Sequence, residues 1–215
     1  MSSIFTRLVE AAWTLVRKPQ AHTLTGPIAE IAFAPGDVAI DCGANLGDVT
    51  VPLAAKGATV YAFEPNPHAF RVLQNRTARF PNVHCFNQGV LDRPEKLRLY
   101  LHKNADANQV KWSNGSSLLA FKTNVNAETS VEVEVIDLSA FIAKIEGPIK
   151  LLKLDVEGVE CPILNKLIDT GCATRIGRIL VETHDRKIPE LRGETDALRR
   201  RIAEAGLTHI DLDWE

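Results

Sequence analysis

The sequence lacks the patterns that mark several common classes of protein. Its four cysteines show no C-x-x-C spacing, which argues against the usual zinc sites and against a disulfide framework. We therefore expect reduced, mostly buried thiols. There is no apolar run of about 18 residues to span a bilayer, and no signal-peptide pattern at the N-terminus. These absences predict a cytoplasmic protein that does not insert stably into a membrane.

The sequence also lacks a large charge excess of either sign. Its formal net charge is −2 at pH 7, so no global field favours nucleic acid or anionic lipid as a partner. The one dense basic run, 199–201, lies between Leu198 and Ile202, which is typical of the solvated face of an amphipathic helix. With 45% hydrophobic and 24% charged residues, the 215-residue chain has the composition of a globular protein with a substantial core.

Strand-like and helix-like segments alternate along most of the chain. Strands are expected at 38–41, 59–64, 83–87, 149–155, 178–182 and 208–214. Helices are expected at 48–56, 67–79, 138–145, 160–169 and 195–205. Strands separated by helical crossovers predict an α/β fold with a Rossmann-like, doubly wound and mostly parallel sheet, which binds ligands at the carboxyl ends of its strands.

Two regions depart from this alternation. Residues 96–102 and 130–137 alternate strictly between apolar and polar side chains, which predicts half-exposed strands in an excursion between the third and fourth core strands. Near the N-terminus, residues 1–18 carry an apolar stripe at helical spacing, and a second helix is expected at 27–34. The stripe is expected to pack on the body of the protein, with a homodimer contact and a membrane-surface contact as alternatives.

The most informative segment is the loop that follows the first core strand. That strand ends at Asp41, and Gly43 and Gly47 bracket the loop before helical spacing begins, a geometry that places backbone N–H groups beneath a nucleotide-like ligand. Asn45 replaces the glycine that lets a pyrophosphate approach the backbone, and Asp41 is expected to face the ligand, where it suits a cation. Glu64 ends the second strand about 20 residues further on, where an acid binds ribose hydroxyls. S-adenosylmethionine, which has an ammonium, a sulfonium and no phosphate, fits these features.

A second group of polar residues follows the fourth and fifth core strands. Asp155 and Glu157 follow the fourth strand, and Glu182 and His184 follow the fifth, so all four are expected to meet at the carboxyl edge of the sheet. Methyl transfer to a hydroxyl benefits from a base. His184 is the first candidate because its ordinary pKa lies near neutrality, and Asp155 is the second, as a base or as the group that orients the acceptor. A histidine in an exposed loop is the structural alternative.

The same acids and histidine could also hold a hard divalent cation, because oxygen ligands suit magnesium or calcium. Their spacing carries no metal signature, so the sequence assigns no metal site. The neighbouring Glu160 is interpreted as an acid at a helix N-terminus, stabilised by the helix dipole.

Five motifs, in order, resemble those of the FkbM-type S-adenosylmethionine-dependent methyltransferases. They are GDVAIDCGANLG (36–47), YAFEPNP (61–67), GSSL (115–118), LKLDVEGVE (152–160) and VETH (181–184). The resemblance runs from about residue 30 to residue 185, and five ordered motifs are more specific than any one of them. It implies a methyltransferase domain over residues 35–215, preceded by a helical appendage at 1–34. It also implies O-methylation of a hydroxyl on a sugar, a glycan or a secondary metabolite.

The residues and the resemblance together define candidate sites. The cofactor-binding candidates are Asp41, Gly43, Asn45, Gly47, Glu64, Pro65, Gln88 and Asp155, and the catalytic candidates are His184, Asp155, Glu157 and Glu182. Gln88 is included because it stands where the family contacts the adenine. After His184 the chain holds only one clear helix and one strand, so the closing antiparallel hairpin of the family looks shortened.

Three other functions are weighed against this one. A nicotinamide-dependent oxidoreductase would need a loop that tolerates a pyrophosphate, which Asn45 opposes. A methyltransferase acting on exocyclic base nitrogens commonly carries an Asn/Asp-Pro-Pro-aromatic run where this chain has Asp-Val-Glu-Gly, and it would need a basic groove. A non-catalytic cofactor-binding module would have a disarmed acceptor site, whereas this chain keeps its acids and its histidine. The resemblance implies a small-molecule or glycan acceptor as the partner, and no nucleic acid.

Overall fold

The structure is a computed structural model, and it describes residues 24–105, 109–113, 116–119, 122 and 124–214. The helix expected over residues 1–18, with its proposed packing or homodimer contact, lies outside the described residues. No helix in the described ranges is long and apolar enough to cross a membrane.

The main sheet has six strands, and all the pairings between them are parallel. The strands are β1 (Val38–Cys42), β2 (Thr59–Phe63), β3 (Val83–Phe86), β7 (Ile149–Leu154), β8 (Ile176–Val181) and β9 (Ile210–Asp211). Their spatial order is β3-β2-β1-β7-β8-β9. The chain winds outward from β1 in one direction and from β7 in the other, so the topological switch point lies between these two strands. The doubly wound sheet predicted from the sequence is confirmed.

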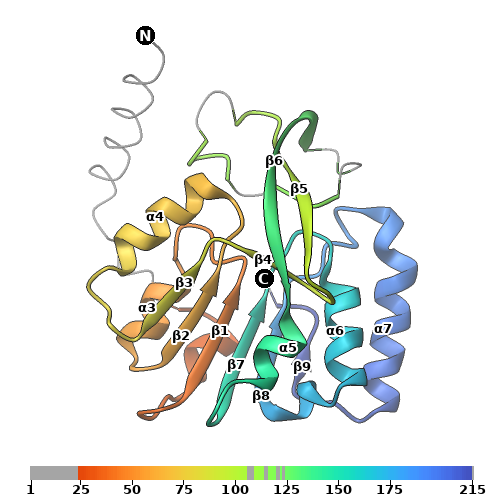
Figure 1. Cartoon of the computed structure of the whole chain (residues 1–215). Helices are drawn as coiled ribbons and strands as arrows, with labels where there is room; N and C mark the ends of the chain where they lie inside the picture. The colour runs from red at the N-terminus through yellow and green to blue at the C-terminus, as the bar shows by residue number, and fades with distance from the viewer. Residues whose placement is uncertain (1–23, 106–108, 114–115, 120–121, 123, 215) are drawn as a thin grey trace.

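Helices cover both faces of the sheet (Figure 1). One face is covered by α2 (Pro27–Glu30), α3 (Thr50–Ala55) and α4 (Pro67–Thr77), and the other by α5 (Leu138–Ala143), α6 (Glu160–Asp169) and α7 (Arg192–Glu204). Among the described residues there are also two 3-10 turns, η1 (Cys172–Arg175) and η2 (Pro189–Leu191). Alternate residues of each strand face opposite layers. Ala39 packs with the α2 and α3 layer and Ile40 with the α5, α6 and α7 layer, and both side chains are 0% exposed.

A smaller sheet lies beyond the carboxyl ends of the main strands (Figure 1). It contains β4 (Gly89–Leu91), β5 (Glu95–His102) and β6 (Val125–Asp137), in the order β4-β6-β5. The predicted excursion between the third and fourth core strands is therefore confirmed, and Leu99, Leu101 and Val133 are among its buried side chains. The strand β4 was not predicted, because three residues are too few for a periodic pattern to appear.

The strand β9 and the helix α2 are shorter than the sequence predicted. The predicted strand 208–214 is reduced to the two residues of β9, which pairs in parallel with β8, while Asp213 makes an isolated antiparallel bridge to Glu182. The helix expected over 27–34 ends at Glu30. Ile28 in this short helix is 2% exposed and packs with Ala39 and Leu53, so this part of the N-terminal segment is joined to the core.

Gly43 is the point of closest approach between the glycine loop and β7. Its φ is +78°, and a Cβ atom at this position would lie 1.8 Å from the carbonyl oxygen of Asp155. Gly57 also has a positive φ, +94°, but a Cβ there would meet no atom within 4 Å. Gly57 therefore isolates the effect of backbone conformation from that of the clash.

We expect Gly43→Ala to lower the free energy of unfolding by about 3 kcal/mol or more, because overpacking against backbone adds to the left-handed strain. Gly57→Ala should lower it by only about 1–2 kcal/mol. Urea denaturation of both variants measures the difference. Equal losses would show that the loop moves away from Asp155 without penalty.

Candidate active site

The loop between β1 and α3 is held from below by the neighbouring strand. The backbone N–H groups of Gly43 and Ala44 both donate to the carbonyl oxygen of Phe63, at 3.0 and 2.9 Å. Asn45 follows with a φ of +46°, a left-handed conformation that asparagine tolerates better than most residues. Arg76 on α4 donates to the carbonyl oxygen of Leu46 at 2.7 Å. The loop is therefore preorganised before any ligand arrives.

Glu64 joins the end of β2 to this loop. Its Oε2 accepts a hydrogen bond from the N–H of Asn45 at 2.8 Å, and its Oε1 accepts one from the N–H of Asn66 at 2.7 Å. Burial raises the pKa of Glu64 to about 7, although the N–H groups of Asn66 and Asn45 favour the ionised form and oppose that rise. The carboxylate is 7% exposed and thus available at the pocket wall without being fully solvated.

Lys153 on β7 contacts both the glycine loop after β1 and Asp155 after β7. Its ammonium lies 3.4 Å from Asp41 Oδ1 and 3.4 Å from Asp155 Oδ2, and it donates to the carbonyl oxygen of Gly43 at 2.8 Å. Burial opposes the charge of Lys153, but the carboxylates of Asp155 and Asp41 outweigh burial and raise its pKa. A permanently charged ammonium thus lies beneath the glycine loop.

A pocket of about 260 Å³ opens at the switch point of the sheet. It is lined by Gly43, Asn45, Phe63, Glu64, Pro65, Gly89, Val90, Leu99, Ser113, Ser116, Leu118, Asp155, Val156, Glu157, Val159, Glu182 and Lys187. Seven of the residues proposed from the sequence are in this lining: Gly43, Asn45, Glu64, Pro65, Asp155, Glu157 and Glu182. The predicted cofactor loop and the predicted acid cluster therefore share one cavity.

Three residues proposed as cofactor ligands do not line the pocket. Asp41 is 0% exposed and accepts a hydrogen bond from Thr50 Oγ1 at 2.6 Å, which corrects the expectation that it faces the ligand. Gln88 donates to Glu134 at 3.3 Å, and the following residues, Gly89 and Val90, line the pocket in its place. Gly47 packs against Leu73 of α4 and closes the turn beneath the loop.

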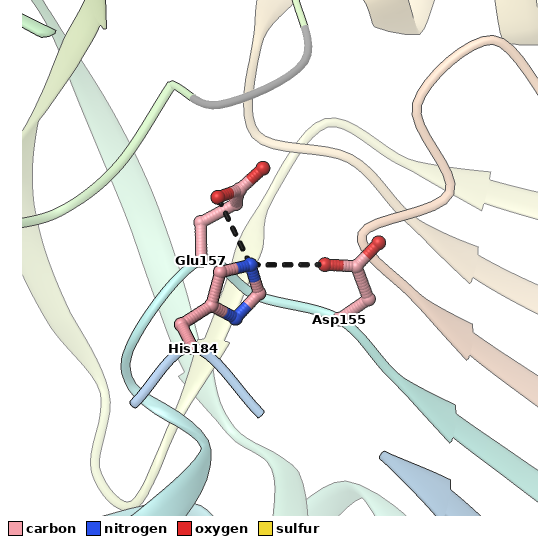
Figure 2. Close-up of side chains that lie close together, drawn as sticks. All are labelled: Asp155, Glu157 and His184. Atoms are coloured by element: carbon pink, nitrogen blue, oxygen red, sulfur yellow. Dashed lines mark ion pairs between the residues drawn. The ribbon is translucent and has the colours of Figure 1, made fainter. Parts of the chain in front are cut away.

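Asp155 and Glu157, which follow β7, lie beside His184 (Figure 2), and Glu182 at the end of β8 lies near the same ring. His184 Nε2 lies 3.1 Å from Glu157 Oε2, 3.8 Å from Asp155 Oδ1 and 3.9 Å from Glu182 Oε1. On the other side of the ring, Nδ1 lies 2.9 Å from Glu160 Oε1. The imidazole is 1% exposed, so the alternative of a histidine in an exposed loop is wrong.

These contacts shift the pKa values of the cluster and so determine which of its groups carry a proton. Burial would lower the pKa of His184, but the contacts with Glu157 and Glu160 outweigh it and raise the pKa to about 10. Burial would raise the pKa of Glu157, but His184 and Lys122 hold it at about 2. Burial raises the pKa of Asp155 above its ordinary value despite the charge of Lys153. In this arrangement His184 carries a proton at neutral pH, so Asp155 is better placed than His184 to accept one.

Several residues of the site were missed by the sequence analysis. Glu160 lies in the first turn of α6, as interpreted, but its burial and its contact with His184 were not foreseen: it is 3% exposed and is the partner of His184. Ser113 Oγ donates to Asn45 Oδ1 at 2.7 Å, and Ser117 Oγ donates to the carbonyl oxygen of Glu157 at 2.7 Å. The two serines belong to the excursion, whose irregular backbone has no periodicity from which such contacts could be predicted.

A parallel α/β sheet with a glycine loop and a strand-terminal acid at its switch point defines a protein that binds a nucleotide-like cofactor. Residues 41–207 match the methyltransferase FkbM domain. The chain belongs to this family of methyltransferases, as its motifs suggested, and the alternative of a nicotinamide-dependent oxidoreductase is set aside.

Curated relatives agree with this assignment. The chain is 30% identical over 200 residues to 31-O-demethyl-FK506 methyltransferase FkbM of Streptomyces tacrolimicus, a match that covers 79% of this chain and 73% of the relative. It is 30% identical over 176 residues to Methyltransferase 1 of Beauveria bassiana, covering 74% and 69%. Two other matches cover much less of the relative's own length. One covers 22% of ribosomal RNA small subunit methyltransferase A of Thermotoga petrophila, and the other covers 9% of the AMB antimetabolite synthetase AmbE of Pseudomonas aeruginosa.

A solved structure shares the fold. The crystal structure of methyltransferase FkbM from Methylobacillus flagellatus superimposes with a TM-score of 0.52 at 16% sequence identity. The match covers 83% of this chain and 41% of that one. At this identity the likeness supports the fold and not a shared substrate.

Removal of the Lys153 ammonium tests whether its ion pairs with Asp41 and Asp155 stabilise the protein. Lys153→Met leaves the buried Asp41 and the partly buried Asp155 without their counter-charge, so we expect the free energy of unfolding to fall by about 3–5 kcal/mol. Lys150→Met is the matched control on the same strand, because the Lys150 side chain is 45% exposed and lies 3.9 Å from Asp37. That control should change stability by at most about 0.5 kcal/mol. Similar losses in both variants, measured by urea denaturation, would contradict the assignment.

Proposed function

We propose that the protein is an S-adenosylmethionine-dependent O-methyltransferase that acts on a hydroxyl of a sugar, a glycan or a secondary metabolite. The observation that carries this proposal is the shared pocket. Asn45 and Glu64, from the cofactor half of the sheet, line the same cavity as Asp155, Glu157 and Glu182. A methyl donor held by the first group would therefore face an acceptor held by the second.

The residues of the cofactor half fit S-adenosylmethionine. Gly43 has no side chain, which lets the loop pack against the backbone of β7 at Asp155, and Gly43 also lines the pocket. The Glu64 carboxylate is oriented by two backbone N–H groups and is suited to accept hydrogen bonds from ribose hydroxyls. Neither group calls for a phosphate. When bound, S-adenosylmethionine supplies a methyl group on a sulfonium sulfur, which an oxygen nucleophile attacks.

The acceptor half supplies the groups that an attacking hydroxyl needs. As the new carbon–oxygen bond forms, the hydroxyl must lose its proton, and the bonding electrons of the broken carbon–sulfur bond return to sulfur. Asp155 lines the pocket, and its raised pKa makes it a better proton acceptor than an exposed aspartate. Glu157 and Glu182 border the same space and can orient the hydroxyl.

The acceptor class is supported by the relatives and by charge. One relative at 30% identity is named 31-O-demethyl-FK506 methyltransferase, a name that places the missing methyl group on an oxygen. The formal net charge of −2 gives no electrostatic attraction for a nucleic-acid backbone. We therefore propose a small-molecule or glycan acceptor, held between the acid cluster and the excursion residues Ser113, Ser116 and Leu118.

Cofactor affinity should depend on pH through Glu64. Only the ionised carboxylate accepts hydrogen bonds from both ribose hydroxyls, so below a pKa of about 7 binding must release a proton. Affinity for S-adenosylmethionine should therefore be about tenfold weaker at pH 6 than at pH 8. Isothermal titration calorimetry of wild type and Glu64→Gln isolates this effect, because protonation of the cofactor is common to both.

The Glu64→Gln variant should bind the cofactor more weakly by about 1–3 kcal/mol, and it should lack the Glu64 part of the pH dependence. Identical pH profiles in the two proteins would remove Glu64 from the cofactor site. Binding of NADH in place of S-adenosylmethionine would overturn the cofactor assignment.

Turnover should depend on Asp155. Wild type, Asp155→Asn and the control Glu132→Gln, whose side chain is 73% exposed, are incubated with 13C-methyl-labelled S-adenosylmethionine and a panel of methyl glycosides and hydroxylated macrolactones. Asp155→Asn should lower turnover by about 10²–10⁴-fold while cofactor binding persists. The label should appear as a methoxy carbon by NMR. A label on nitrogen or carbon would contradict O-methylation, and wild-type turnover in Asp155→Asn would contradict the role of Asp155.

A further inference from the structure

The Nε2 nitrogen of His184 points into the acid cluster without a hydrogen-bond partner. The imidazole is 1% exposed, and no residue in the described part of the chain makes a hydrogen bond with Nε2. Its contact with Glu157 Oε2, at 3.1 Å, lies outside the direction of an N–H···O bond. A buried polar atom of this kind calls for an explanation, such as an ion bound in the site.

The opposite side of the ring determines which nitrogen carries a hydrogen. Glu160 Oε1 accepts hydrogen bonds from the backbone N–H groups of Val156 and Gly158, at 3.2 and 3.0 Å, and lies 2.9 Å from His184 Nδ1. A carboxylate that already accepts two hydrogen bonds is an acceptor here too, so Nδ1 donates. Nε2 is the ring nitrogen that faces Asp155 and Glu157 (Figure 2), so a cation that displaced its proton would meet the Nε2 lone pair there. Metal-binding histidines show this arrangement, with a carboxylate behind the ring.

The donor atoms have the spacing of a cation site. One ligand atom from each of Asp155, Glu157 and His184 lies within 4.8 Å of the other two. Two ligand atoms at about 2.1 Å from a common ion lie about 3–4 Å apart, and small side-chain rotations bring the present distances into that range. We propose that Asp155, Glu157 and His184 bind one divalent cation of the Mn²⁺ or Zn²⁺ type. One imidazole and two carboxylates suit these ions, and three protein ligands leave positions open for substrate.

The charges of the connected cluster support a divalent ion. Among the described residues, and with a neutral imidazole, the side chains joined by ion pairs in this cluster are five carboxylates (Asp41, Asp155, Glu157, Glu160 and Glu182) and three ammonium groups (Lys122, Lys153 and Lys187). This leaves two negative charges in a largely buried site, which is expensive without a counter-ion. A proton on His184 neutralises one of them, whereas a divalent cation neutralises both. Glu157 would be shared between the cation and Lys122.

The role of this cation in the reaction rests on the proposed O-methyltransferase function. An acceptor hydroxyl bound at an open position would lose its proton more easily, because the cation stabilises the alkoxide. In the cation-loaded site Asp155 would be a ligand, so Glu182, which lies outside the ligand set and borders the same pocket, would take that proton in place of Asp155. The oxygen then forms its bond to the methyl carbon as the carbon–sulfur bond breaks.

Mn²⁺ binding to the full-length chain tests the site without any acceptor. Protein treated with EDTA and desalted is titrated with Mn²⁺, and the electron paramagnetic resonance signal of the free aqua ion reports binding. Wild type should bind one Mn²⁺ per chain, in competition with Zn²⁺. His184→Ala and Asp155→Asn should each weaken binding by about tenfold or more, and Glu160→Gln, which only positions the ring, by about 10–100-fold. The control Glu132→Gln should bind like wild type.

A spectroscopic measurement on the wild type tests the site without any variant, so it stays valid if a variant fails to fold. Electron spin echo modulation of the Mn²⁺-loaded protein should show the coupled nitrogen of a coordinated imidazole. Absence of that nitrogen, or no binding of Mn²⁺ or Zn²⁺ up to about 1 mM, overturns the site. Calorimetry with S-adenosylmethionine on the same samples separates the two proposals. Cofactor binding without cation binding rejects only the metal site, and cation binding without cofactor binding rejects only the proposed function.

Discussion

The buried ammonium of Lys153 is the interaction on which the site depends. It lies at the junction of β1 and β7, where the register places Asp41 opposite Lys153. From that position it pairs with Asp41 and Asp155 and donates to the carbonyl oxygen of Gly43. Without a cation there, the buried Asp41 and the partly buried Asp155 would lie beside the glycine loop without a counter-charge. One side chain thereby joins the start of the cofactor loop to the first residue of the acid cluster.

The excursion between β4 and β7 contacts both the glycine loop and the acid cluster. Ser113 bonds to Asn45 of the glycine loop, and Ser117 bonds to the backbone of Glu157 in the acid cluster. Glu157 has a φ of +61°, a strained conformation for a residue with a side chain. The contacts of its carbonyl oxygen with Ser117, and of its carboxylate with Lys122 and His184, hold it in that conformation. The side chain that borders the acceptor space is thus positioned by segments far apart in the sequence.

Much of the fold and of the cofactor half was predictable because its signals are local. Strand β1 is buried along its whole length and is followed at once by the glycine loop, so periodicity and turn chemistry coincide within a dozen residues. Glu64 follows the next strand for the same reason. The failures occurred where local signals are ambiguous. Asp41 was expected to face the ligand. It lies near the end of the buried strand β1, where the pleat directs its side chain to Thr50 and Lys153. Gln88 was assigned by position alone, and the short strand β4 places Gly89 and Val90 on the pocket wall instead.

The sequence by itself determined the doubly wound sheet, the order of its elements and the family, because periodicity and five ordered motifs are written in contiguous residues. It also brought Asp155, Glu157, Glu182 and His184 to one edge, since parallel strands end on the same side. Only the tertiary structure decided how these groups share their protons. Glu160 lies behind the ring of His184, Lys122 reaches Glu157 from the excursion, and burial shifts each pKa in a direction that no sequence pattern records. The physical reason is that pKa values and metal affinity depend on distances of a few ångströms between side chains, which chain order does not specify.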